Sequence, residues 1–321
     1  MEREIGSEFH RMSVEGGHGL ALPRPGSLVF SGRTAIEGVL RQLPEARTAL
    51  LPSYCCDSMI VPFRDAGIEV RFYSVEWNDS LKVEIDGSAD ILLWCNYFGF
   101  RNEMPEFDGI VIEDMTHSML STRQCHERSD YLVGSVRKWE PVNCGGYCSV
   151  KMDGEAPPDE FLQVKTRAME LKREYLENPE PGKKPVFLSM FGESNHWLAE
   201  HYSGLSIDPW SREFLSRVDV KKQRDRRRDN AGVLYEGLRG KVQFMFPVED
   251  MDCPLFVPIL IQNRDEIRKY LTNNEIYCPV HWPCSEGCAS NLYGQELSLI
   301  CDQRYGPEDM ERIVSVIREV L

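Results

Sequence analysis

Apolar positions in the first half of the chain alternate between helical and strand-like spacing. Between residues 34 and 43, apolar side chains recur every three or four positions, which predicts an amphipathic helix. Short apolar runs bounded by turn residues follow at 48–51, 70–75, 91–95, 109–112 and 131–133, with a crossover helix predicted at 58–66. Strand-like runs separated by helical segments are typical of parallel βαβ units, whose sheet is buried on both faces.

The second half of the chain has a different order of elements. Residues 160–176 have helical spacing between charged, proline-rich loops and predict a long exposed helix, and 211–238 form a second helical tract. Later segments predict strands at 242–246 and 255–261, a helix at 265–273, a strand at 275–280 and a terminal helix at 307–321. We therefore expect a large α/β domain over residues 1–209, with an N-terminal arm at 1–27, and a small α+β domain over 210–321.

Composition narrows the classes of function. The 321 residues carry 37 Lys and Arg against 51 Asp and Glu, a formal net charge of −14, so we expect no nucleic-acid partner. No apolar run approaches the ~20 residues that span a bilayer, so we expect no membrane partner. The charged N-terminus lacks the apolar core of a secretory signal, which indicates a cytoplasmic protein whose eleven cysteines are reduced. A small molecule is the expected ligand.

The most basic segment of the chain is KKQRDRRR, at residues 221–228. One interpretation is a solvated helix face in which Asp225 and Asp229 supply i,i+4 partners to the cations. The other interpretation is a patch that faces an anion.

Two clusters in the first half of the chain are suited to binding an anion and a cation. SGRTA, at 31–35, is a glycine turn that opens a helix, where backbone N–H groups and the helix dipole can hold a phosphate, although Ser31 can also be a simple N-cap. VIEDMTH, at 111–117, places Glu113 and Asp114 at the end of a strand, where parallel sheets bind ligands. An acid there can hold a cationic heterocycle nitrogen or cap the next helix.

Two further clusters contain candidate reactive side chains. GSVRKWEPVNCGG, at 134–146, places Lys138 after a buried-looking strand and before a double glycine. A lysine on apolar ground has a lowered pKa and can form a Schiff base. EIYCPVHWP, at 275–283, contains His281, which is either a substrate contact or a satisfied histidine at the end of a strand.

The order of these clusters resembles the fold type I, aspartate aminotransferase-like enzymes that use pyridoxal 5'-phosphate (PLP). Within them the chain looks like the DegT/DnrJ/EryC1/StrS sugar aminotransferases, as a divergent and short member. Similar segments include LLPSYCC (50–56), NYFG (96–99), CPVHWP (278–283) and the closing stretch 297–317, and the similarity spans about residues 31–321. The resemblance implies an α/β fold with a large, mostly parallel sheet of the seven-stranded type and a small α+β C-terminal domain.

The resemblance also implies catalytic roles for the matching residues. Lys138 would form the internal aldimine with PLP and then move a proton between substrate and cofactor. Asp114 would pair with the pyridine nitrogen and keep the ring an electron sink. Thr116 would lie against one ring face, and His117 would hydrogen-bond the ring phenolate oxygen. Gly32, Arg33, Thr34 and Ser135 would bind the phosphate.

The chain departs from the family where the ring and substrate would bind. The family stacks an aromatic side chain on the cofactor ring, and the matching position here is Cys55 or Cys56. Either Tyr54 or Tyr97 replaces that aromatic residue, or the ring is held differently, and we assign Cys56 to the cofactor site. The family's Gly-Tyr-Asn-x-Arg stretch has no clean match in residues 201–213. Candidate substrate contacts are Tyr54, Tyr97, Arg137 and His281. For Arg137 there are two interpretations: it binds a carboxylate or phosphate, or it points to solvent.

The resemblance implies an aminotransferase that takes an amino group from an amino acid, with glutamate favoured, and gives it to a keto-sugar carried on a nucleotide. It implies a homodimer with active sites at the subunit interface. Alternatives are a PLP enzyme of another reaction class, such as elimination or dehydration, or a non-catalytic relative that binds a ligand or partner.

We expect no metal site, although His281, Cys284 and Cys288 can be drawn as zinc ligands. Cys55, Cys56 and Cys144 are expected beside the cofactor, as packing residues or as redox-sensitive thiols.

Overall fold

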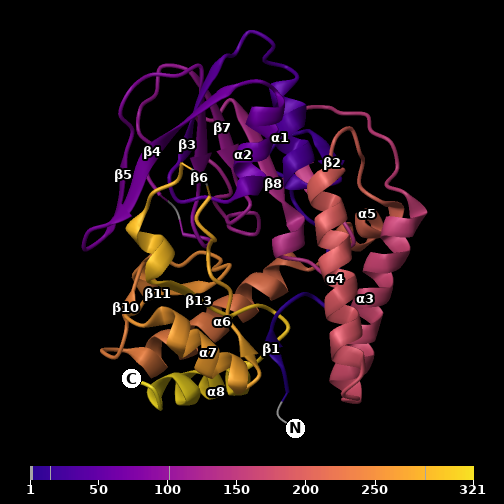
Figure 1. Cartoon of the computed structure of the whole chain (residues 1–321), viewed down its shortest axis with the longest axis vertical. Coiled ribbons are helices and arrows are strands. Elements are labelled where there is room, and N and C mark those ends of the chain that lie inside the picture. The colour runs from indigo at the N-terminus through magenta and orange to yellow at the C-terminus, as the bar shows by residue number, and fades with distance from the viewer. Residues whose placement is uncertain (1–2, 15, 101, 286) are drawn as a thin grey trace.

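Among the described residues, eight strands form one mixed sheet in the order β2-β9-β8-β7-β6-β3-β4-β5 (Figure 1). The computed structural model describes residues 3–14, 16–100, 102–285 and 287–321. The central strands are parallel: β4 (Glu69–Trp77), β3 (Thr48–Pro52), β6 (Ile91–Cys95), β7 (Ile110–Asp114) and β8 (Tyr131–Ser135). Antiparallel strands complete the two sides: β5 (Leu81–Glu84), β9 (Gly146–Cys148) and β2 (Ser27–Val29).

The large, mostly parallel sheet predicted from the apolar runs is confirmed, and each of the five predicted strands is present. Every residue of β6 is buried, as expected for a strand covered on both faces. The sheet has eight strands rather than seven because β5 turns back and extends the edge at β4. Strands β2 and β9 have three residues each, too few to show a period in the sequence.

Helices α1 (Gly32–Leu40) and α2 (Asp57–Asp65) lie together in front of the sheet in Figure 1. The buried stripe of α1, which includes Ala35, Ile36 and Val39, confirms the helical spacing in the sequence. Ser31 is the N-cap, because its hydroxyl oxygen accepts a hydrogen bond of 3.2 Å from the Thr34 N–H. The helix therefore begins two residues earlier than the apolar pattern alone predicts.

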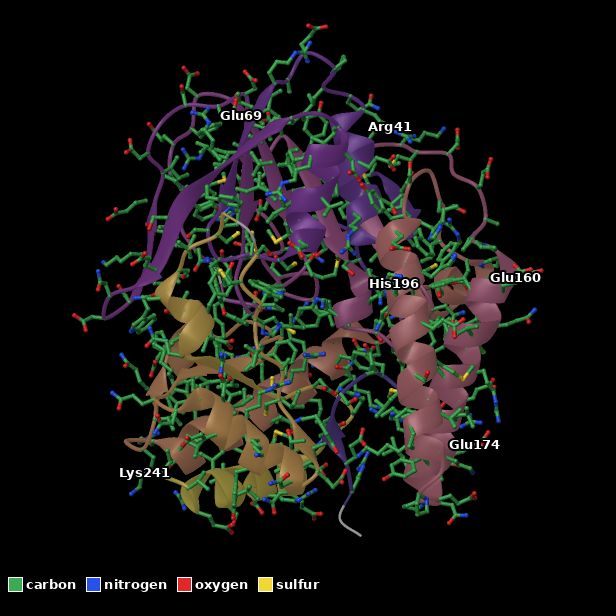
Figure 2. The ribbon with its side chains drawn as sticks, viewed as in Figure 1. Arg41, Glu69, Glu160, Glu174, His196 and Lys241 are labelled. Carbon is green, nitrogen blue, oxygen red and sulfur yellow. The ribbon has the colours of Figure 1, made fainter. Side chains whose placement is uncertain are left out.

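Helix α3 (Asp159–Glu177) packs against α4 (Lys183–Glu200) as a hairpin beside the sheet (Figure 1). The prediction of an exposed helix is therefore wrong for one face of α3, where Phe161 and Met169 are buried. Glu160 on the opposite side projects away from the molecule (Figure 2). The sequence pattern does not predict α4, because its apolar residues are spread around the helix instead of forming one stripe.

A small antiparallel sheet, β10 (Gln243–Phe244), β11 (Val257–Leu260) and β13 (Glu296–Leu299), packs with three helices around a second core. These helices are α6 (Val220–Leu238), α7 (Arg264–Asn273) and α8 (Pro307–Arg318), with short helices η2 (Val248–Asp250) and η3 (Asn291–Gly294) in the connections. Strand β1 (Ile5–Gly6) pairs in parallel with β12 (Ile276–Tyr277), so the first residues of the chain lie against its last third. None of the helices in the described part of the chain has the length and apolar character that crossing a membrane requires.

The helical tract predicted at 211–238 is two helices rather than one. It divides into α5 (Pro209–Leu215) and α6, with a break at 216–219. Asp219 explains the new start, because its side chain accepts a hydrogen bond of 3.0 Å from the Lys222 N–H and so caps α6.

The basic run on α6 divides between two environments. On the solvent side, Lys221 pairs with Asp225 at 2.5 Å, which agrees with the solvated interpretation. On the inner side, Arg227 is fully buried and donates hydrogen bonds to the Gln303 side chain and to two backbone carbonyls, those of Pro254 and Leu255. Its guanidinium also lies 4.5 Å from the centre of the Trp139 ring. Arg227 therefore joins α6 to the segment around Lys138.

We predict that Arg227→Ala destabilises the fold strongly. The substitution removes three charge-assisted hydrogen bonds and leaves two carbonyls without their donor, which costs about 3 kcal/mol or more of unfolding free energy. Arg228→Ala is the matched control, since Arg228 is the next residue and is exposed. Urea unfolding followed by circular dichroism measures both. Equal midpoints for the two variants would contradict a structural role for Arg227.

Candidate active site around Lys138

The carboxyl ends of β7 and β8 and the start of α1 meet at one edge of the large sheet. Asp114 is the last residue of β7, and Lys138 ends the short helix η1 (Val136–Lys138) that follows β8 directly. The register pairs Asp114 with Val133 of β8, so the two strands end side by side. Parallel sheets bind their ligands at this edge. The pairing therefore brings together two of the clusters that stand apart in the sequence.

Neighbouring residues of β7 point to opposite faces of the sheet, so Glu113 and Asp114 have different surroundings. Glu113 is fully buried and accepts hydrogen bonds from the Asn96 amide at 2.6 Å, from the His126 N–H at 2.8 Å and from the Ser129 hydroxyl. Burial raises the pKa of Glu113, but these hydrogen bonds outweigh it and lower the pKa below its usual value. Glu113 is thus a structural carboxylate.

Asp114 lies within electrostatic reach of Lys138. It is buried, and it accepts a hydrogen bond of 2.8 Å from the Thr116 N–H. Burial raises the pKa of Asp114, and the charge of Lys138 acts in the opposite direction. The Thr116 hydroxyl oxygen accepts a hydrogen bond of 3.0 Å from the Ser135 N–H and so ties the two strand ends together.

Two neutral histidines lie within the electrostatic reach of Lys138. Burial and the charge of Lys138 lower the pKa of His117 to about 3, and burial, His117 and Lys138 lower that of His281. His117 Nδ1 accepts a hydrogen bond of 3.0 Å from the Phe98 N–H, so the proton of the neutral ring is on Nε2. His281 Nδ1 lies 2.8 Å from the Ser298 hydroxyl, so its ring is already hydrogen-bonded. The two ring centres are 5.8 Å apart.

The start of α1 offers the predicted anion site fewer free groups than the sequence suggests. The Thr34 hydroxyl is fully buried and donates a hydrogen bond of 2.7 Å to the Tyr202 carbonyl, which leaves it unavailable to a phosphate. A Cβ on Gly32 would lie 3.4 Å from the Ser135 Cβ, so the helix start adjoins that serine. Arg33 Nε is buried without a hydrogen-bond partner. The helix start, Arg33 and Ser135 therefore remain as candidate anion ligands.

Lys138 itself is exposed, whereas the sequence suggested apolar surroundings, because η1 carries it past the end of the sheet. A cavity of about 610 Å³ opens beside it. Six of the charged residues that line the cavity are cationic and two are anionic: Arg33, Arg137, Lys138, Arg227, Arg268 and Arg304 against Glu8 and Asp302. This excess of positive charge occurs in a protein of net charge −14.

Arg137 lines the cavity instead of pointing away from the molecule. Its guanidinium donates a hydrogen bond of 2.9 Å to the Asn195 Oδ1 of α4, and the Asn195 amide donates one of 2.9 Å to Glu8. Glu8 also lies 3.9 Å from the buried Lys165 ammonium. Burial raises the pKa of Glu8, but the cations Lys165, Arg137 and Lys138 together lower it to about 2. The N-terminal segment is thus part of the cavity wall.

The hydroxyls of the two predicted aromatic contacts, Tyr54 and Tyr97, are hydrogen-bonded within the protein. Tyr54 is fully buried with its hydroxyl 3.3 Å from Glu296, and the Tyr97 hydroxyl donates a hydrogen bond of 2.8 Å to the Tyr54 carbonyl. The Cys56 thiol lies 2.8 Å from the Ser58 hydroxyl at the start of α2. Both tyrosine rings are buried, and that of Tyr54 packs against the rings of Tyr97, Trp282 and Tyr293, so a substrate would reach either ring only after these side chains move.

Trp282 is the site residue that sequence reasoning missed. Its ring is half-buried and lies 5.8 Å from the His117 ring, with the two planes 26° apart. It also lies 5.1 Å from the ring of Tyr54. The one available signal was its place directly after His281 in CPVHWP, the segment already identified as a candidate.

Known structures match this architecture over most of the chain. DesV from S. venezuelae matches with a TM-score of 0.63 and 15% identity, over 92% of this chain and 85% of that chain. DesI matches with a TM-score of 0.64 and 14% identity, over 94% and 81%. A DegT DnrJ EryC1 StrS aminotransferase from Brucella abortus matches with a TM-score of 0.58 and 15% identity, over 92% and 85%. No family sequence model matches the chain, and no curated protein is detectably similar in sequence.

The chain has the fold of the DegT/DnrJ/EryC1/StrS sugar aminotransferases. This confirms both the resemblance noted in the sequence and the predicted fold class. At about 15% identity the sugar aminotransferase fold does not by itself transfer residue roles, which have to be argued from the geometry around Lys138.

We predict opposite stability effects for the two acids of β7. Glu113→Gln should lower the unfolding free energy by roughly 2 kcal/mol, because it breaks a buried charge-assisted hydrogen-bond network. Asp114→Asn should leave the protein at least as stable at pH 7, because the folded protein raises the pKa of Asp114 above 3.8 and so disfavours its charged form.

The sign of the Asp114 effect sets its pH dependence. A raised folded-state pKa contributes stability at low pH that is lost as the pH rises through that pKa. Any gain from Asp114→Asn should therefore shrink as the pH falls towards 3.8. Denaturant unfolding of both variants at pH 4 to 8 checks this. A strongly destabilised Asp114→Asn would show that Asp114 is structural.

Proposed function

We propose that this protein is a PLP-dependent aminotransferase that moves an amino group from an amino acid, with glutamate as donor, to a keto-sugar carried on a nucleotide. The observation that carries the proposal is the arrangement at the carboxyl edge of a sugar aminotransferase fold, where the charge of Lys138, which lines a cationic cavity, acts on both Asp114 and His117. Among the matched structures, DesI is described with its TDP-sugar product, and a Streptococcus pneumoniae protein in PLP and PMP forms.

The residues present fit PLP in their chemistry. Arg33 Nε is a buried donor without a partner beside the start of α1, and a phosphate would satisfy it. Asp114 offers a carboxylate to a protonated ring nitrogen, and that hydrogen bond would offset the cost of its burial. His117 Nε2 carries a proton that a phenolate oxygen can accept. When bound, PLP supplies an electron sink for the carbanion that forms at the substrate Cα.

Lys138 would hold the cofactor covalently and then transfer a proton at the substrate Cα. Its exposure to the cavity allows the side chain to swing between these two tasks. Thr116 bridges Asp114 and Ser135, so it keeps the acid and the strand end that carries the lysine in a fixed relation. The neutral ring of His117 can donate a hydrogen bond from its Nε2–H without placing a second positive charge near Lys138.

The cationic cavity supports anionic substrates. Arg268 of α7 lines it and donates a hydrogen bond of 3.2 Å from its Nε to the Cys278 carbonyl. Arg137 lines it too and donates a hydrogen bond to Asn195. Guanidinium groups bind carboxylates and phosphates with matched geometry, as glutamate and a nucleotide diphosphate require. His281 stays a predicted substrate contact, with its ring 5.8 Å from that of His117 and 5.1 Å from that of Trp282.

A homodimer with active sites at its interface belongs to the same proposal. Val186 and Leu188 on α4 are 49% and 45% exposed, whereas Asn195 and Leu198 of the same helix line the cavity. A partner that covers the exposed apolar end of α4 would also come close to the cavity mouth.

We predict that Lys138→Ala abolishes covalent cofactor binding. Wild-type protein mixed with PLP should show a visible absorption band, and borohydride reduction should fix the cofactor on the peptide that contains Lys138. The variant should show neither, while Lys151→Ala, at an exposed lysine, should behave like the wild type. Mass spectrometry of the reduced protein locates the adduct.

Adding glutamate to the wild type then distinguishes the reaction classes. A shift of the band to that of the pyridoxamine form supports transamination. A band that persists with every amino donor favours another PLP reaction or a binding role. The absence of any band with the wild type would refute PLP use altogether.

We predict that Trp282 provides an aromatic face for the cofactor ring. Its half-buried ring lies 5.8 Å from that of His117, the residue that would hydrogen-bond the cofactor, so the indole is an aromatic group within reach of that ring. Trp282→Ala should raise the PLP dissociation constant about tenfold, equal to ~1.4 kcal/mol, and Trp282→Phe should restore most of the affinity. Spectrophotometric titration measures this, with Trp210→Phe as the control.

A further inference from the structure

Two thiols from distant parts of the chain meet beside the candidate site. Cys55 follows β3 in the large sheet, and Cys288 lies between β12 and η3, 233 residues later. Their Sγ atoms are 3.8 Å apart. Both are buried, with Cys55 fully covered and Cys288 8% exposed. Nothing in the proposed transamination uses either thiol.

The segment that carries Cys288 is anchored firmly against the large sheet. The Tyr293 hydroxyl accepts a hydrogen bond of 3.1 Å from the Cys55 N–H and lies 2.9 Å from the Ser53 carbonyl. The Ser290 hydroxyl donates a hydrogen bond of 2.6 Å to the Val75 carbonyl of β4. Asn291 bonds both the N–H and the carbonyl of Trp77, at 2.9 and 2.8 Å. These contacts hold the two sulfur atoms together without a covalent bond.

The surroundings of the pair favour a thiolate on Cys288. The pKa of Cys288 is lowered to about 7, chiefly because its sulfur accepts a hydrogen bond from the Cys55 thiol. Burial raises this pKa, and a hydrogen bond from the Tyr293 hydroxyl lowers it further. Asp57 and Arg64 act on it with opposite and smaller effects. The same contact raises the pKa of Cys55, which therefore keeps its proton. A thiolate beside a protonated thiol is the arrangement in which a sulfur first oxidised by peroxide is resolved by its neighbour.

We propose that Cys55 and Cys288 are an oxidation site that takes hydrogen peroxide and closes to a disulfide between the two parts of the fold. Cys288 sulfur attacks one peroxide oxygen, the O–O bond breaks, and hydroxide leaves with the electron pair, which converts Cys288 to a sulfenic acid. Cys55 sulfur then attacks Cys288 sulfur, and the sulfenic oxygen leaves as water with the proton from Cys55. Together the two thiols lose two electrons, and one peroxide becomes two waters.

The disulfide would act on the segment that completes the candidate site. Residues 281–293 carry His281 and Trp282 and cross from the small sheet to the large one. A bond between Cys55 and Cys288 would fasten that segment beside Tyr54 and Cys56, and a cross-link over so long a loop restricts the unfolded chain strongly. The oxidised protein should therefore unfold at a temperature several degrees higher than the reduced protein.

The experiment is a thiol map of the full chain before and after peroxide. Reduced protein is desalted, treated with equimolar hydrogen peroxide, blocked with iodoacetamide and digested without reductant for mass spectrometry. We expect the loss of two of the eleven thiols and a cross-linked peptide pair that contains Cys55 and Cys288, reversed by dithiothreitol. Thermal unfolding of the two forms measures the stability gain.

Variants separate this pair from its neighbours. Cys55→Ser and Cys288→Ser should each abolish the cross-link, whereas Cys278→Ser, at a buried cysteine of the same region, should retain it. Near-ultraviolet circular dichroism of the reduced variants checks that they fold. The exposed Cys284, whose thiol lies 3.1 Å from the Cys288 carbonyl, is the competing partner.

A cross-link between Cys284 and Cys288 in the wild type would overturn the proposal. So would a free Cys55 after Cys288 has oxidised to its sulfinic acid. The peptide map of the wild type decides this even if a variant fails to fold, and its outcome does not depend on whether the protein binds PLP.

Discussion

Parallel pairing of β7 with β8 determines where the chemistry of this protein can occur. The register ends both strands at the same edge, so Asp114 at the end of β7 lies within electrostatic reach of Lys138, which follows β8. Burial of the central strands on both faces keeps that edge rigid, because the strands cannot slip without exposing apolar side chains. Thr116, Ser135 and Trp139 then hydrogen-bond across the junction and hold η1 in place.

Local charge at this edge opposes the charge of the whole molecule. A net charge of −14 repels anions at long range, yet the cavity beside Lys138 has an excess of cations. Salt screens the long-range field beyond about 8 Å at physiological ionic strength, whereas guanidinium groups in direct contact with a ligand act below that distance. If the cavity binds an anion as proposed, cavity cations such as Arg33 and Arg137 would act on it more strongly than the acidic surface.

The sequence was sufficient to predict what depends on local pattern. Strand β6 and helix α1 follow from runs of apolar residues, and Lys138 and Asp114 follow from their position after such runs. The chain pattern could not predict α4, whose apolar residues meet different neighbours on different sides, nor the loss of the Thr34 hydroxyl to Tyr202, 168 residues away. Contacts of that range depend on tertiary packing and leave no period in the sequence.

An irregular segment joins the small sheet to the large one. Residues 281–285 and 287–293 have no period in the sequence, so neither a helix nor a strand was predicted there, and hydrogen bonds from Ser290, Asn291 and Tyr293 hold this segment to the large sheet. Because these anchors lie after Trp282, the segment is fixed at its far end and turns the indole towards His117. A ligand bound beside Trp282 would therefore contact a segment that is held by both parts of the fold, so its affinity depends on the packing between them.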